Sequence, residues 1–115
     1  MEYVLNEDGL GYAVTGLGDY AGTTLIIPDT YNELPVTAVA NGALKGANIT
    51  SLSIGNNITS IGSEAFMDCA ALNTISIGNC VTHIGEGAFT RTGYFNNDSN
   101  WENKVLYIGK YLIDV

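Results

Sequence analysis

The lone histidine and the scattered acidic residues are the side chains of this sequence that could carry acid–base chemistry. Histidine is a common general base in enzymes, and a catalytic role for His83 would require a nucleophile or a carboxylate held beside it. It lies between the apolar residues Val81 and Ile84, at a position that we expect to face outward. No arrangement of a nucleophile with a base, or of paired carboxylates, is recognisable in the sequence. We therefore expect a surface histidine, no catalytic residues and no enzyme activity.

The two cysteines and the Asn-rich stretch 96–102 are the groups that could hold a metal ion. Cys69 and Cys80 are 11 residues apart, without the CxxC pairs or clustered histidines of a zinc site. Two cysteines are also too few for a disulfide framework in so short a chain. We expect two free thiols, with Cys69 acting as a small buried apolar group. Because residues 96–102 fit no calcium-loop spacing, the sequence predicts no metal and no cofactor.

The charge balance excludes two classes of partner. The chain has 115 residues, with 4 basic and 12 acidic side chains and a net charge of −8. So few cations cannot neutralise the phosphates of a nucleic acid or of an anionic membrane. No apolar run approaches the ~18 residues of a membrane span. The first residues lack a signal-peptide pattern, so we expect either a cytosolic chain or a piece of a longer secreted protein.

A sequence motif that recurs after 23 residues indicates the fold that positions all these side chains. Three segments recur in the same order and at the same spacing: 52–55, 58–62 and 65–66, and then 75–78, 81–85 and 88–89. A fixed period of this size is typical of a solenoid coil of the leucine-rich kind. In such a solenoid each coil packs only against its neighbours.

Each coil can be interpreted position by position. Leu52 and Ile54 alternate with small polar residues, which predicts a half-buried strand. Phe66 and Phe89 lie one period apart and should stack as the largest core side chains. The segments 63–66 and 86–89 read as single helical turns, the first capped by Ser63. Gly62 and Gly85 are expected to adopt backbone angles that other residues avoid.

The repeats divide the chain into three parts. An Asp-Gly turn between short apolar runs predicts a capping β-hairpin in residues 1–24. Residues 25–92 hold the repeats, as coils 25–51, 52–74 and 75–92, and the first coil carries an inserted surface loop within residues 29–35. Residues 93–115 form an aromatic, Asn-rich loop and a C-terminal hairpin. We therefore predict a mainly β fold with short helical turns: a leucine-rich-repeat solenoid of about three coils with parallel strands, capped by a β-hairpin at each end.

The repeated phrase resembles the BspA-like leucine-rich repeat family of bacterial surface proteins. The residues that carry the resemblance are Leu52, Ile54, Ile58, Thr59, Ile61, Gly62, Ala65, Phe66 and Cys69, and again Ile75, Ile77, Val81, Thr82, Ile84, Gly85, Ala88 and Phe89. Departures are Gly55 and Gly78, where the family often has proline, Leu44 in place of a phenylalanine, and Thr92 in place of a common cysteine. The resemblance implies secretion or surface display and binding of host or microbial surface proteins. It brings no catalytic residues with it.

Two surfaces are candidates for recognition. The first is a ladder of hydroxyl side chains on the outer face of the predicted sheet, comprising Thr24, Ser51, Ser53, Thr74 and Ser76. Leucine-rich solenoids commonly bind partners with such extended surfaces, and the alternative is a merely solvated face. The second is an aromatic patch comprising Tyr94, Phe95, Trp101 and Tyr107. Exposed Tyr and Trp often anchor interfaces, although these rings could instead cover the open end of the last coil.

Two functions remain open on this basis. One is a non-enzymatic protein-interaction or adhesion module of a bacterial secreted or cell-surface protein. The other is a purely structural spacer that holds another domain away from the cell wall. The sequence names neither the ligand nor the oligomeric state.

Overall fold

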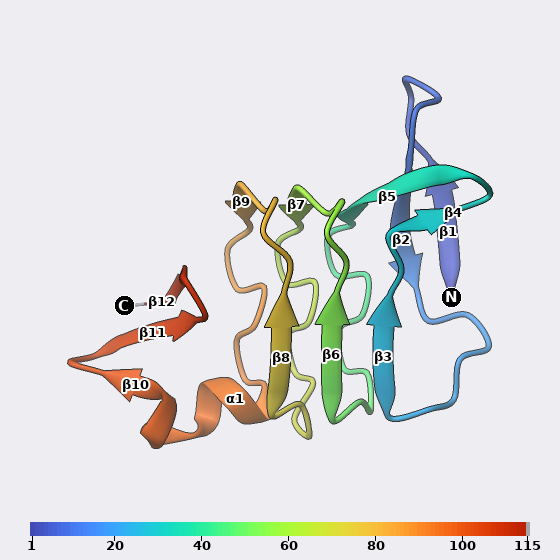
Figure 1. The fold of residues 1–115 in the computed structure, drawn as a ribbon. Coiled ribbons are helices and arrows are strands. Elements are labelled where there is room, and N and C mark those ends of the chain that lie inside the picture. The colour runs from blue at the N-terminus through green and yellow to red at the C-terminus, as the bar shows by residue number, and fades with distance from the viewer. Residues whose placement is uncertain (115) are drawn as a thin grey trace.

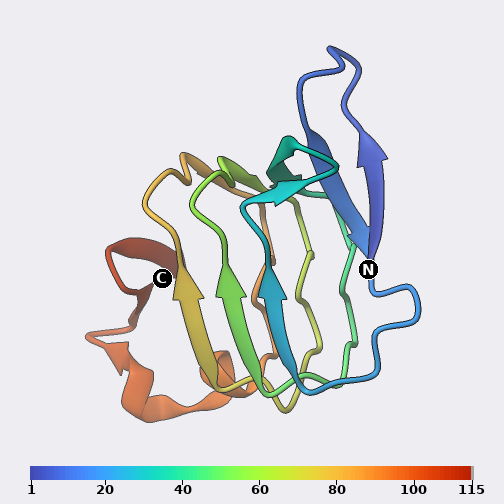
Figure 2. The same cartoon turned by 45° about the vertical axis from the view of Figure 1, so that its right-hand side comes forward.

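The repeats form coils that stack side by side (Figures 1 and 2). Each coil contributes one strand to each of two β-sheets, which form the two walls of the solenoid, and strands of neighbouring coils pair in parallel. This computed structural model describes residues 1–114, so Val115 of the predicted C-terminal segment lies outside the described part. The first wall is a parallel sheet in the order β3-β6-β8, with strands Thr24–Ile27, Ser51–Ile54 and Thr74–Ile77. These strands match the predicted half-buried segments.

The second wall is a sheet in the order β1-β2-β5-β7-β9. Its strands are β1 (Glu2–Leu5), β2 (Tyr12–Gly16), β5 (Leu34–Val39), β7 (Ser60–Ile61) and β9 (His83–Ile84), and β4 (Thr30–Tyr31) pairs with β5 outside this path. β1 and β2 form the predicted N-terminal antiparallel hairpin. Because β2 pairs in parallel with β5, the hairpin continues the wall by two strands, and its tip projects beyond the coils in both views (Figures 1 and 2).

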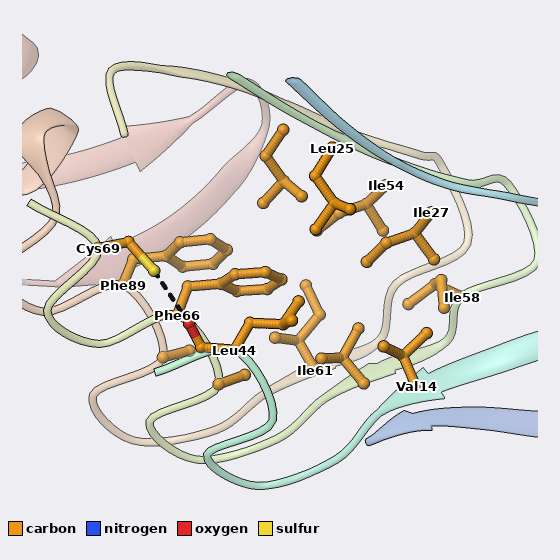
Figure 3. Packing of buried hydrophobic residues seen from close by; sticks show 14 of the residues in the cluster. Val14, Leu25, Ile27, Leu44, Ile54, Ile58, Ile61, Phe66, Cys69 and Phe89 are labelled. Atoms are coloured by element: carbon orange, nitrogen blue, oxygen red, sulfur yellow. Dashed lines mark hydrogen bonds between the residues drawn. The ribbon is translucent and has the colours of Figure 1, made fainter. Parts of the chain in front are cut away.

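The core fills the space between the walls. Leu25, Leu52 and Ile75 occupy the same register position of neighbouring strands, and the first two are buried. Phe66 and Phe89 stack with ring centroids 5.3 Å apart and planes 9° from parallel, as predicted from their spacing (Figure 3). Both rings are fully buried, so they account for the largest apolar contribution of the coil interior.

The predicted helical turns at 63–66 and 86–89 are wrong. Both segments are successive hydrogen-bonded turns without a helix. Glu64 and Asp68 have φ of 57° and 63°, and these left-handed angles interrupt a right-handed helix. Their amides instead donate to carbonyl oxygens of the next coil. Ser63 caps no helix because none follows it, and its backbone amide donates to the side-chain oxygen of Asn41 over 2.8 Å.

The expectation that Gly62 and Gly85 adopt backbone angles avoided by other residues is also wrong. Neither glycine has a positive φ. A Cβ on Gly62 would lie 2.5 Å from the backbone nitrogen of Asn41, and one on Gly85 would meet Ser63 in the same way. The coils approach each other closely here, so a side chain is excluded by space and not by backbone angle.

The C-terminal part has more structure than the predicted loop and hairpin. Helix α1 (Gly93–Asn96) and the 3-10 helix η1 (Asp98–Asn100) occupy the expected loop. β10 (Trp101–Glu102) then adds to the predicted hairpin of β11 (Val105–Ile108) and β12 (Tyr111–Asp114), giving an antiparallel sheet in the order β10-β11-β12. Tyr111 ties this sheet to the last coil, because its hydroxyl donates to the carbonyl oxygen of Gly78 over 2.7 Å.

Candidate functional site

The outer face of the sheet β3-β6-β8 carries all five predicted hydroxyl residues. Thr24, Ser51 and Thr74 are direct register partners, and they form one row across the three strands. Ser53 and Ser76 belong to a second row, two residues further along. Neighbouring strands lie about 4.8 Å apart, so the hydroxyls of each row recur at that interval.

Ile26 completes the second row and was missed by sequence reasoning. It is the register partner of Ser53, and its side chain is 65% exposed. The alternation that buries Leu25 and Ile27 turns Ile26 outward, so the signal was present in the period-2 pattern. The face therefore combines hydroxyl groups with one apolar side chain at its edge.

The hydroxyls of this face differ in their hydrogen bonding from those of Thr59 and Thr82, which directly precede β7 and β9 of the opposite wall. Thr59 and Thr82 donate to backbone carbonyl oxygens of the preceding coil over 3.3 and 3.2 Å, so their hydroxyls hold neighbouring coils together. Within residues 1–114, no hydroxyl of the five sheet-face residues has such an intramolecular partner. Each keeps a donor and two acceptor positions for solvent or for a bound molecule.

A polar hollow continues the hydroxyl face at the carboxyl ends of the strands. It has a volume of about 500 Å³, and its lining includes Asp29, Asn56 and Asn79. The Asp29 carboxylate accepts a hydrogen bond from the backbone amide of Asn56 over 2.8 Å. The hollow is therefore partly organised by the inserted loop of the first coil, and it offers amide and hydroxyl groups to a ligand.

The predicted aromatic patch is largely engaged in internal contacts. Phe95 and Trp101 meet edge to face with centroids 5.2 Å apart, and the indole nitrogen of Trp101 donates to the carbonyl oxygen of Phe95 over 2.6 Å. The Tyr94 hydroxyl likewise donates to the carbonyl oxygen of Tyr107. Tyr94 also packs against the core, which favours the covering role. Of the four residues only Tyr107 is largely exposed, at 46%, and recognition by this patch stays a prediction.

The titratable residues are dispersed in the structure. Cys69 is buried, with its sulfur 3.1 Å from the carbonyl oxygen of Leu44, and burial raises the pKa of its thiol. Cys80 and His83 are exposed. A hydrogen bond from Arg91 lowers the pKa of Asp68. Among residues 1–114, no three His, Cys, Asp or Glu side chains gather as metal ligands would.

Comparison with known proteins identifies the family. A family model described as the BspA type leucine rich repeat region, in six copies, matches residues 23–114. The chain belongs to the BspA-type leucine-rich repeat family. The match confirms the resemblance drawn from the repeated phrase, and it covers the coils and the C-terminal sheet of β10, β11 and β12.

Two solved structures support the BspA-type assignment and the solenoid fold. The leucine-rich repeat protein of T. pallidum has a TM-score of 0.69 at 27% identity, covering 78% of this chain and 42% of that one. A leucine-rich repeat protein from Bacteroides capillosus has a TM-score of 0.69 at 26% identity, covering 76% of this chain and 67% of that one. The chain thus aligns with less than half of the T. pallidum protein. No curated protein matches it in sequence.

The BspA-type family is known for surface proteins, and such repeats commonly mediate protein binding and are typically non-catalytic. Neither helix among residues 1–114 has the length and hydropathy that crossing a bilayer demands.

Proposed function

We propose that this chain is a non-enzymatic protein-interaction module of a bacterial secreted or cell-surface protein, with an adhesive role toward host or microbial surface proteins. The observation that supports this proposal most directly is the hydroxyl face of β3-β6-β8. Its five Ser and Thr side chains have no hydrogen-bond partners within residues 1–114, whereas the hydroxyls of Thr59 and Thr82, just before β7 and β9, bond between coils.

The backbone beneath this face supports binding because it is already ordered. Each strand pairs with its neighbour over four residues, so a partner would not have to fix the backbone when it binds. The entropic cost of association is correspondingly low. Ser and Thr donors and acceptors would bond to polar groups of the partner, and Ile26 would provide the apolar contact at the edge.

One observation favours the alternative, a structural spacer. The face carries neither Trp, Tyr nor Arg, the residues that most often dominate binding energy at interfaces. A spacer requires only a regular stack of coils with a solvated surface. It predicts that no substitution on the sheet face changes attachment to any surface.

Substitution of the hydroxyls separates the two functions. The double variant Ser53→Lys/Ser76→Lys places two long cationic side chains on the exposed second row. Its matched control, Ala70→Lys/His83→Lys, adds lysines at two exposed positions elsewhere. Binding to immobilised extracellular-matrix proteins and to intact bacterial cells would be measured by surface plasmon resonance and by cell attachment.

We expect the sheet-face variant to lose binding while the control retains it, with unchanged circular dichroism in both. Equal binding by both variants would remove the sheet face as the site. Failure of the unmodified chain to bind any of these surfaces would favour the spacer.

A further inference from the structure

Three tyrosines from distant parts of the chain meet at the N-terminal end. The rings of Tyr3 and Tyr31 are stacked with centroids 3.9 Å apart. Tyr12 meets Tyr31 edge to face at 5.0 Å and Tyr3 at 6.3 Å. The three residues come from β1, β2 and β4, so the inserted loop of the first coil is fastened to the hairpin by aromatic contacts.

The hairpin is held rigidly by other contacts as well. The Asn6 side chain donates to the Thr37 hydroxyl over 2.9 Å. Gly11 is so close to the first coil that a Cβ there would lie 2.9 Å from the carbonyl oxygen of Pro35. The projecting hairpin is therefore a preorganised surface, and a partner would bind it without a large ordering cost.

This rigid hairpin exposes large apolar side chains along an open strand edge. β1 is the outermost strand of its sheet and pairs only with β2 among residues 1–114. Val4 and Leu5 on β1 are 56% and 49% exposed, and Leu10 is 68% exposed. Leu5 faces Tyr12 across the hairpin and lies two residues after Tyr3, so it extends the face that holds the tyrosine cluster. An outer strand with apolar side chains is a template for pairing with another strand.

The charged side chains of the hairpin are all acidic. The first lysine or arginine of the chain is Lys45. Before it, the chain carries six acidic residues, namely Glu2, Glu7, Asp8, Asp19, Asp29 and Glu33. All six are exposed. Of these residues, Glu2 lies on β1, and Glu7 and Asp8 lie in the turn that joins β1 to β2. Exposed carboxylates therefore flank the apolar edge, which is complementary to a segment that carries lysine or arginine beside apolar residues.

We propose that the β1 edge of the N-terminal hairpin is a second binding surface, which takes an extended cationic segment of another protein as an added β-strand. Backbone hydrogen bonds to β1 would give affinity, and alternate side chains would give specificity. The apolar side chains of the segment pack on Leu5 and the tyrosine cluster, and its cationic side chains face the acidic residues. The surface is separate from the hydroxyl face of β3-β6-β8, so it does not depend on the function proposed above.

A second copy of the chain fits this edge less well. Two hairpins placed edge to edge would bring together segments whose charged side chains are all acidic, and like charges in contact oppose association. The proposal therefore predicts a monomer in the absence of a cationic segment.

A synthetic peptide of alternating valine and lysine serves as the probe. Its affinity for the full chain would be measured by isothermal titration calorimetry, and protection of the β1 amides by hydrogen exchange. Leu5→Lys and Tyr31→Ala alter the proposed surface. Their matched controls at the other end of the molecule are Leu112→Lys and Tyr107→Ala, which change side chains 55% and 46% exposed. Leu112 also lies on an outer strand, β12, so both Lys variants test an edge.

We expect Leu5→Lys and Tyr31→Ala to weaken peptide binding at least about tenfold, while both controls stay within about twofold of the unmodified chain. Proline at alternate peptide positions removes the backbone donors and should abolish protection of β1. Circular dichroism verifies that each variant is folded. Equal weakening by Leu112→Lys, or unimpaired binding of the proline peptide, overturns the proposal, because charge alone would then explain binding. Dimers that form without peptide and disappear in Leu5→Lys also overturn it, since a second copy would then be the occupant.

Discussion

The stacked pair Phe66 and Phe89 is the residue-scale basis of the solenoid. Phe66 is fully buried, and its ring faces that of Phe89 in the next coil. Replacing a buried phenylalanine by alanine removes its apolar contacts and leaves a cavity.

We expect Phe66→Ala to lower the free energy of unfolding by roughly 3–5 kcal/mol, measured by chemical denaturation. Tyr107→Ala is the control, because Tyr107 lies on the surface. A loss below about 1 kcal/mol for Phe66→Ala would contradict the burial of this ring.

The two cysteines should differ in reactivity. The thiolate is the reactive form of cysteine, and burial raises the pKa of Cys69. Its thiol therefore stays protonated to higher pH than an exposed one, in addition to being shielded from reagents. We expect a disulfide reagent to label Cys80 rapidly in the folded chain and Cys69 only after unfolding. Rapid labelling of Cys80→Ser would contradict this expectation.

At the scale of elements, the turns that join the two walls depend on left-handed backbone angles. Gly42 and Gly46 in the first coil have φ of 62° and 73°, and both amides donate to the second coil. Two positions four residues apart are left-handed in each of the three turns, and side chains occupy some of them, as Asp68 shows.

Gly46→Ala tests this angle alone, since a Cβ at Gly46 would meet nothing within 4 Å. We expect a loss of roughly 1–2 kcal/mol in the free energy of unfolding, because an alanine resists the left-handed region. Gly46→Asn should lose less, since asparagine tolerates that region better. Equal stability of all three proteins would mean that the turn adopts other angles.

The sequence predicted the strands of the repeats well, because alternation and period both indicate them. Leu52 and Ile54 point inward as expected. The helical turns were mispredicted because the left-handed angle at Glu64 has no compositional signal. The tyrosine cluster was missed because two features bring its members together: the insertion that carries Tyr31, and the pairing of β2 with β5. Neither feature follows the 23-residue repeat, so the sequence pattern does not indicate it.

At the scale of the whole molecule, the last coil of the stack lacks some of the hydrogen bonds that each earlier coil makes to the coil after it. The amides of Leu44 and Phe66 donate to the carbonyl oxygens of Ala65 and Ala88 in the following coils. The corresponding amide of Phe89 has no acceptor among residues 1–114. It borders a hollow of about 580 Å³ between the last coil and the C-terminal sheet.

We expect hydrogen exchange to reveal this asymmetry. The amides of Leu44 and Phe66 should be protected, while that of Phe89 should exchange much faster, since exchange requires a broken hydrogen bond. The comparison is internal, because all three positions are buried and equivalent in the repeat. Equal protection of Phe89 would show that the last coil has an acceptor in solution.

The single tryptophan gives this small solenoid a built-in optical reporter of one end. Trp101 is half-buried, and its indole is fixed to Phe95 in the C-terminal segment. Tryptophan fluorescence therefore reports only the unfolding of that end. Far-ultraviolet circular dichroism reports the strands of every coil. A denaturation followed by both signals would show whether the stack melts as one unit or loses its coils in succession from the C-terminal end.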